Sequence, residues 1–111
     1  MQTSYGIITT TLTKHEQADA LTQALLEQRL VACVHSFSIT SHYIWNGDTV
    51  ASDEIVLQMK TTTALFDRVR AAIELLHPYE VPEIIMTPII EGNQAYLEWI
   101  DSMVMKALPC Q

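Results

Sequence analysis

The segment from His77 to Tyr79 carries the side chains best suited to chemistry in this chain, an imidazole and a phenol separated by Pro78. A neutral imidazole binds divalent metals, and it also acts as an acid or base near neutral pH. The other interpretation is structural. His77 stands at the end of a predicted helix, where a partial positive charge stabilises the terminus by roughly 0.3–1 kcal/mol. Both interpretations stay open from the sequence.

A second pair of possible metal ligands is formed by Cys33 and His35, two residues apart in a predicted strand. Alternate side chains of a strand point to the same face, with Cα atoms about 6.6 Å apart, so a soft metal could bridge them. Cysteine is also among the most frequently buried residue types, and the apolar neighbours of Cys33 are typical of an inert core thiol. Cys110 is far away in the sequence, so we expect free thiols rather than a disulfide.

Aromatic residues predict a pocket at a subunit boundary, with a few polar groups that would orient a ligand. Four rings and two charged groups would form it: Tyr43, Trp45, Tyr79, Trp99, Lys60 and Glu80. The alternative is that these rings fill cores and interfaces, where each buries a large area. Glu54 shares strand parity with Lys60, and the two could form a surface ion pair that contributes very little.

Composition and charge exclude several classes of function. Six Lys and Arg against thirteen Asp and Glu give a formal charge of −7, so neither nucleic acid nor an acidic membrane surface is an expected partner. There is no apolar stretch long enough to span a membrane, and the first residues do not resemble a signal peptide, so we expect a cytoplasmic protein. The three glycines form no phosphate-binding loop, and nucleophile-elbow and metalloprotease motifs are absent, so we expect no enzyme.

The elements that must position these side chains follow from the hydrophobic pattern. Residues 5–12 read as a strand and 14–29 as an amphipathic helix, with a capping box formed by Thr13 and Glu16. Two further strand patterns flank the turn at residues 46–48 and predict a long hairpin from Val31 to about residue 61, in which we expect a bulge.

The second half of the chain repeats the order of helix and strand. A helix begins among residues 61–63, carries an apolar stripe that includes Leu76, and ends before Pro78. The run at 83–90 contains Pro88, which favours an edge strand, and Asn93 caps a final helix with Met103 on its apolar stripe. The order predicts an α+β fold of the ferredoxin-like βαββαβ type, as one domain over residues 1–111 with a flexible tail at 105–111.

The predicted hairpin is too long for a monomer of this size. Fifteen extended residues from Val31 to Trp45 would span about 50 Å, whereas a compact domain of this length is about 34 Å across. The hairpin must therefore bend or project, and a projecting hairpin exposes apolar side chains and unpaired backbone groups. Closed cyclic symmetry would cover both, so we expect a homo-oligomer.

Several motifs together resemble one family, the CutA divalent cation tolerance proteins. They run from about residue 5 to residue 104: "LVACV" at 30–34, S-x-Y-x-W-x-G at 41–47, "MKT" at 59–61, "HPYEVPEI" at 77–84, "PI" at 88–89 and "YLEWI" at 96–100. The resemblance implies a cytoplasmic homotrimer of ferredoxin-like subunits, similar in architecture to the PII signalling proteins. It also implies an association with copper and other divalent cations.

The resemblance also places three copper-binding positions of the family, a cysteine and two adjacent histidines, at Thr10, Leu76 and His77. Only His77 has a matching side chain, whereas divalent transition metals typically need three or four N, S or O donors. We therefore expect a non-enzymatic trimer linked to divalent metal tolerance, with weak metal binding through His77 and Cys33. The alternative is a PII-like signalling or scaffold trimer that binds a small metabolite or a partner protein in clefts between subunits.

Overall fold

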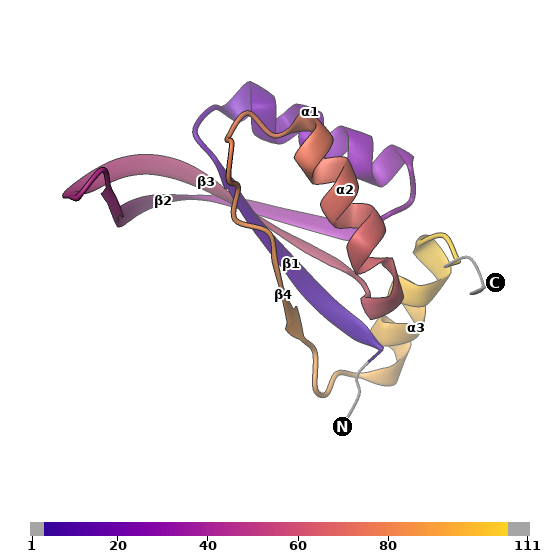
Figure 1. Ribbon diagram of the computed structural model, residues 1–111. Coiled ribbons are helices and arrows are strands. Elements are labelled where there is room, and N and C mark those ends of the chain that lie inside the picture. Colours follow the sequence, from indigo (N-terminus) through magenta and orange to yellow (C-terminus); the bar gives the residue numbers. More distant parts are fainter. Residues whose placement is uncertain (1–3, 107–111) are drawn as a thin grey trace.

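A four-stranded antiparallel sheet covered by two helices on one face forms the body of the protein (Figure 1). The computed structural model describes residues 4–106. The elements follow in the order β1 Tyr5–Leu12, α1 His15–Glu27, β2 Cys33–Trp45, β3 Asp48–Thr62, a 3₁₀ turn Thr63–Leu65, α2 Phe66–Leu76, β4 Ile85–Pro88 and α3 Gln94–Met103. The strand order β2-β3-β1-β4 confirms the predicted ferredoxin-like α+β fold.

The core lies between the sheet and the helices α1 and α2. It is made of alternate residues from β1 and β3 together with the inner stripes of both helices; its fully buried members include Ile8, Leu57, Met59, Leu25, Val69 and Ile73. Because strand side chains alternate, the neighbours of these residues point to the opposite face of the sheet. Lys60 lies on that opposite face, where α3 packs at one end and places Tyr96 over the Lys60 ammonium.

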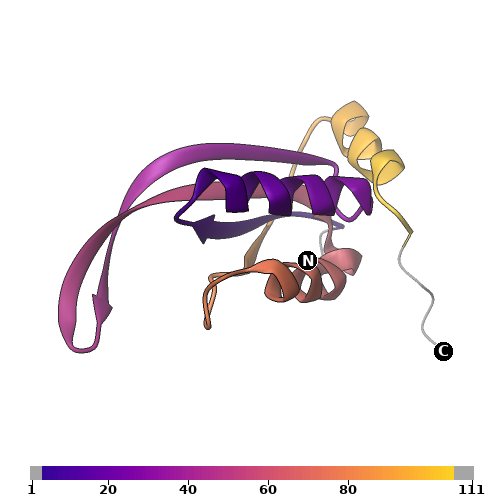
Figure 2. The ribbon, with the colours of Figure 1, turned by 90° about the horizontal axis from the view of Figure 1, so that it is seen from above.

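The β2–β3 hairpin is regular along its whole length. Its register runs without interruption from Cys33 opposite Lys60 to Trp45 opposite Asp48, so the predicted bulge was wrong. The turn uses Asn46 and Gly47, both with positive φ, as the tight turn of a twisted hairpin requires. The ribbon accommodates its length by bending smoothly, which Figure 2 shows, and no extra residue is needed.

The outer half of the hairpin projects beyond the body. β1 ends where Leu12 pairs with Ile55, so residues 39–45 and 48–54 pair only with each other; we call this two-stranded part the hairpin tip. The molecule measures 43 × 27 × 26 Å, and its long axis exceeds the 34 Å expected of a compact domain of about this length. The prediction that the hairpin bends or projects is confirmed.

Helix α1 begins one residue later than the predicted capping box requires. Lys14 occupies the N-cap without a side-chain cap, and the first turn closes through the backbone from Ala18 to Lys14 at 3.1 Å. The capping-box prediction was therefore wrong. The Thr13 hydroxyl is instead hydrogen-bonded to the Tyr79 side chain, so a tertiary contact has replaced the local one.

Helix α2 ends at Leu76 and His77 takes extended backbone geometry before Pro78, as predicted. The apolar stripe stops earlier, because Leu76 is 51% exposed and lies beyond the part of the helix that faces the core. The assignment of Leu76 to the buried stripe was wrong.

Strand β4 is a short edge strand that contains Pro88, as predicted. Asn93 occupies the N-cap of α3, although its side chain makes no capping bond, and Met103 is exposed rather than part of the inner stripe. After α3, the Met105 amide donates to the Arg29 carbonyl at 2.8 Å, so residues 105 and 106 continue along the body. Most of the predicted tail, with Cys110, lies outside the described residues.

Candidate functional site

The corner between α2 and β4 is held by the two ring nitrogens of His77. Its Nε2 lies 2.7 Å from the Thr11 carbonyl oxygen, and its Nδ1 lies 3.1 Å from the Tyr79 amide nitrogen. A carbonyl only accepts and an amide only donates, so the ring is the neutral tautomer with its proton on Nε2. His77 is 8% exposed, and its imidazole therefore joins the corner to β1 as a buried, fully paired group.

Burial also sets the protonation of this corner. Desolvation lowers the pKa of His77, and it outweighs the Thr11 carbonyl and the Glu54 carboxylate, which both favour the protonated ring. The Tyr79 ring packs edge-on against the imidazole at 4.6 Å, and its hydroxyl donates to Glu54 at 2.9 Å. Desolvation and this hydrogen bond raise the pKa of Tyr79 to about 12. Both rings are neutral near pH 7.

Thr10, Leu76 and His77, which the family resemblance places at copper-binding positions, do not fit a resident metal. Both nitrogens of His77 are hydrogen-bonded, so neither has a free lone pair, and Leu76 offers no donor. Thr10 is fully buried and supplies only a hydroxyl. Among residues 4–106, no three His, Cys, Asp or Glu side chains are grouped so that they could hold a metal ion.

A cleft of about 660 Å³ opens between the hairpin tip and the corner segment that follows His77. Its walls come from the end of β1, from both strands of the tip and from the corner: Thr11, Ser41, His42, Tyr43, Trp45, Glu54, Tyr79, Glu80, Val81 and Glu83. The bend of the hairpin forms one side of the cleft, and the two prolines that fix the corner position the other. A volume of this size is within the range of small-molecule sites.

Four of the residues predicted to share a pocket do lie together in this cleft, namely Tyr43, Trp45, Tyr79 and Glu80. Lys60 does not. It lies six residues along β3 from Glu54, about 20 Å away in an extended strand. The predicted Glu54–Lys60 pair is therefore wrong, because Glu54 accepts the Tyr79 hydroxyl instead.

Lys60 belongs to a second cluster at the base of the hairpin. Its ammonium lies 3.5 Å from Nδ1 of His35 and 5.6 Å from the centre of the Tyr96 ring. Trp99 is not among the lining residues of the cleft, contrary to prediction, and stacks on Tyr96 at 5.5 Å. Cys33 pairs with Lys60 across the strands and is a half-buried free thiol.

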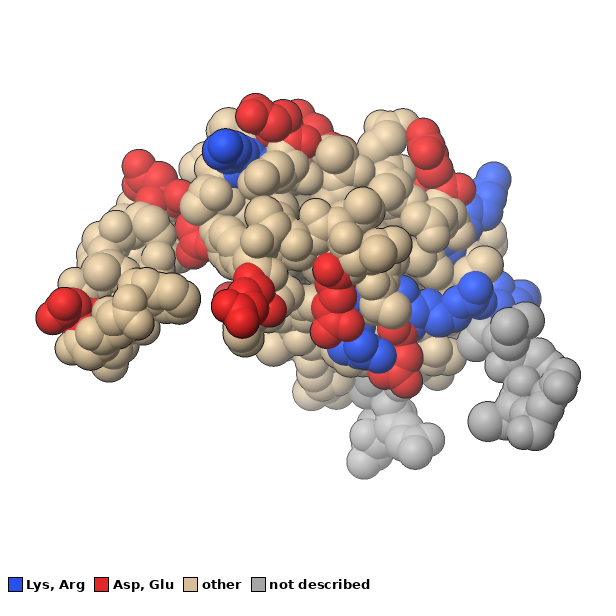
Figure 3. Space-filling view, turned by 45° about the horizontal axis from the view of Figure 1, so that its top comes forward, with Lys and Arg blue, Asp and Glu red and all other residues tan. Residues whose placement is uncertain are grey.

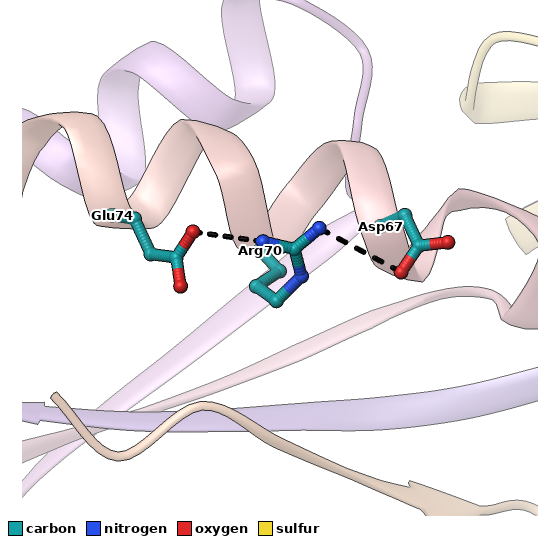
Figure 4. A network of polar contacts seen from close by, with 3 residues as sticks. All are labelled: Asp67, Arg70 and Glu74. Atoms are coloured by element: carbon teal, nitrogen blue, oxygen red, sulfur yellow. Dashed lines mark hydrogen bonds and ion pairs between the residues drawn. The ribbon is translucent and has the colours of Figure 1, made fainter. Parts of the chain in front are cut away.

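Charge is distributed unevenly over the molecule. The hairpin tip contains no Lys or Arg, and Figure 3 shows acidic side chains on it while basic ones gather mainly at the opposite end. On α2, Arg70 is engaged by Glu74 at 2.8 Å and Asp67 at 3.8 Å (Figure 4). The lining residues of the cleft include three carboxylates and no Lys or Arg that would neutralise their charge.

Several lining residues were missed by the sequence reasoning. Thr11 comes from a strand distant in sequence from the tip, and Glu83 lies in the corner without a recognisable motif. Glu54 was assigned to the wrong partner, because strand parity alone does not show which loop folds over a strand. The sequence signal that could have indicated an acidic corner is the position of Glu80 and Glu83 on either side of the "VP" pair.

The geometry first defines a class: a ferredoxin-like α+β subunit with a projecting hairpin and an acidic, aromatic cleft beside it. A model of the CutA1 divalent ion tolerance proteins matches residues 6–103. The chain therefore belongs to the CutA1 divalent ion tolerance protein family, and the resemblance inferred from the sequence is confirmed.

Individual relatives agree with this assignment. The divalent-cation tolerance protein CutA of Thermus thermophilus is 42% identical over 95 residues, which cover 85% of this chain and 92% of that protein. The crystal structure of CutA1 from Shewanella sp. SIB1 has a TM-score of 0.91 at 34% identity and covers 96% of this chain and all of that one. The CutA structure from Archaeoglobus fulgidus, described as periplasmic, has a TM-score of 0.89 at 35% identity over 91% of this chain and 99% of that one.

The relatives from Thermus thermophilus and Archaeoglobus fulgidus are named as divalent cation tolerance proteins and not as enzymes. Within residues 4–106, no helix has both the length and the apolar character needed to cross a membrane.

Proposed function

We propose that the protein is a non-enzymatic homotrimer that takes part in divalent cation tolerance in the cytoplasm. The family assignment and the names of the relatives support the link to divalent cations. Fractionation of cells tests the location, since the relative from Archaeoglobus fulgidus is described as periplasmic. Recovery with periplasmic markers would contradict the cytoplasmic assignment.

The exposure of the hairpin tip is the main observation that supports a trimer. Its side chains Ile44 and Trp45 are 75% and 65% exposed, and its strands have no third neighbour among residues 4–106. An exposed apolar ribbon of this kind promotes aggregation unless a partner covers it. A closed ring of subunits buries three tips at once and leaves no tip available for further association.

Light scattering at micromolar concentration tests this assembly. We expect a mass of about three times the 12.5 kDa of one chain, and a shift toward 12.5 kDa in an Ile44→Asp variant. Thr49→Asp, opposite Ile44 but replacing a polar side chain, is the matched control. A folded wild-type monomer would contradict the proposal.

For metal ions, copper included, we propose weak binding without a resident centre. His77 offers a lone pair only if the Tyr79 amide releases Nδ1, and Cys33 with His35 is the second position. Calorimetric titration with Cu(II), Zn(II) and Ni(II) tests both, with His77→Ala and Cys33→Ser as variants. Binding that neither substitution weakens would remove both residues from the proposal.

The cleft favours a second candidate function, a PII-like trimer that binds a small metabolite or a partner beside the hairpin. Its volume of about 660 Å³ and its aromatic and carboxylate lining support a ligand site. Thermal-shift screening tests this function, because a ligand at 100 times its Kd stabilises the folded state by about 2.7 kcal/mol. A screen of anionic, neutral and cationic metabolites without any shift would count against it.

A further inference from the structure

We propose that the cleft between the hairpin tip and the corner binds a flexible organic polycation of the alkyl diamine or polyamine class. This inference rests on the second candidate function, the ligand-binding cleft, and specifies its ligand. The lining supplies charge, apolar walls and hydrogen-bond acceptors in an arrangement that suits an extended amine.

The charge of the lining selects a cation. Glu54 from β3 and both Glu80 and Glu83 from the corner line the cleft, and no Lys or Arg does. A concave surface with one sign of charge raises the local concentration of oppositely charged ligands. Alkyl amines are protonated at neutral pH, since an amine like that of lysine has a pKa of about 10.4.

The separation of these carboxylates favours an extended ligand over a compact ion. Mg²⁺ and Ca²⁺ need six or more oxygen ligands at about 2.0–2.6 Å around one point. Among residues 4–106, no three acidic, histidine or cysteine side chains are grouped closely enough for such a site. Amino groups at the two ends of a methylene chain can instead reach separate carboxylates.

The remaining walls match the methylene segments and the charged heads of such a molecule. Tyr43, Trp45 and Val81 line the cleft together with the carboxylates. Aromatic faces attract ammonium groups by about 0.5–1 kcal/mol at exposed sites and by more when water is excluded. The same surfaces provide apolar contact for the carbon chain between the amines.

Two groups that line the cleft can accept hydrogen bonds from a donor-rich ligand. A threonine hydroxyl can accept an ammonium N–H, and Thr11 is one of the lining residues. One carboxylate oxygen of Glu54 is fixed by the Tyr79 hydroxyl at 2.9 Å. The carboxylate is therefore held in place before a ligand arrives.

Calorimetry with 1,4-diaminobutane and spermidine tests the site, with Mg²⁺ as a compact control that carries the same charge as the diamine. The cleft variant is Glu80→Gln with Glu83→Gln, two exposed positions. The matched variant is Glu27→Gln with Glu98→Gln, two exposed positions outside the cleft lining, at the last residue of α1 and in the middle of α3. Both variants change the net charge equally, and glutamine keeps an acceptor for the amides of Gln23 and Gln94.

We expect the cleft variant to bind the diamine about tenfold more weakly, as the loss of charge-assisted contacts implies, and the matched variant to change by less than about twofold. Equal weakening in both variants, Mg²⁺ binding as tightly as the diamine, or no heat at about 1 mM amine would each overturn the inference. Light scattering runs in parallel. A trimer that binds no diamine overturns this inference alone, whereas a 12.5 kDa species that binds it supports the site and contradicts only the trimer.

Discussion

The two halves of the β2–β3 hairpin share one uninterrupted register but differ in what stabilises them. At the base, β3 pairs with β1 as well as β2, and Leu57 is 1% exposed beneath the helices. At the hairpin tip the same two strands pair only with each other, and Ile44 and Trp45 are largely exposed. The base is stabilised by the core of its own chain, whereas the tip has only its ladder and its corner contacts.

The difference shows that regular backbone pairing does not by itself require a local core. An isolated two-stranded hairpin is marginally stable in water. The tip continues a ladder that is already anchored at the base, and the Tyr79–Glu54 hydrogen bond attaches the corner where the tip begins. The apolar side chains of the tip are consequently available for contacts beyond the subunit.

Removing core volume at the base should have the largest effect. Leu57→Ala deletes a buried side chain and leaves a cavity, so we expect the free energy of unfolding to fall by about 2–5 kcal/mol. Denaturant unfolding at fixed protein concentration measures the loss. A change smaller than that caused by Ile44→Ala at the tip would reverse the comparison between the two halves.

Breaking the corner should have the next largest effect. His77→Ala leaves the Thr11 carbonyl and the Tyr79 amide without their partner, so we expect a loss of about 1–3 kcal/mol in the free energy of unfolding. His77→Gln, whose amide can both donate and accept, should recover part of the loss. Equal stability of the alanine variant and the native chain would show that the corner does not depend on this residue.

The same corner predicts a dependence of stability on pH. The folded-state pKa of His77 lies below its unfolded value of 6.5, so the unfolded chain takes up the proton first as the pH falls. The contribution of His77 to the free energy of unfolding is therefore fully present above pH 6.5. It decreases below that pH until the folded-state pKa is reached, with a slope of at most about 1.4 kcal/mol per pH unit.

Unfolding curves of the native chain and His77→Gln between pH 7.5 and about 5 isolate this contribution, because the other histidines are present in both proteins. We expect the difference in stability between the two to shrink toward acid pH. A difference that stays constant over this range would exclude His77 as the titrating group.

Substitution at the tip should have the smallest effect on the folded subunit. Trp45→Ser removes a ring that is largely exposed, so we expect a change within about 0.5 kcal/mol when unfolding is followed at concentrations where the chain is monomeric. At higher concentrations the same variant should assemble less than the native chain. A large loss in the monomer would mean that the tip is stabilised within the subunit.

Much of the fold was predictable because local chemistry and global arrangement agree. Pro78 ended α2, Pro88 marked an edge strand, and the Asn46–Gly47 turn closed the hairpin. The predictions that were wrong concern places where a distant segment overrides a local preference. Thr13 is the clearest example, since its hydroxyl serves Tyr79 rather than the end of α1.

The candidate site was predictable only in part. The spacing of Tyr43 and Trp45 placed both on one side of a strand, and Tyr79 and Glu80 stand beside a proline corner, so four lining residues were found. Lys60 was included for its charge alone, and its separation from the tip became visible only when the register of β3 was known.

The sequence by itself determined the elements, their order and an excess hairpin length, because these follow from side-chain periodicity, turn residues and the fixed rise of a strand. The tertiary structure decided what His77 does and which carboxylates share a cleft. Both depend on how closely the corner folds against β1 and β3, which is a matter of contacts between residues 25 to 66 positions apart in the chain. No local pattern encodes such a distance.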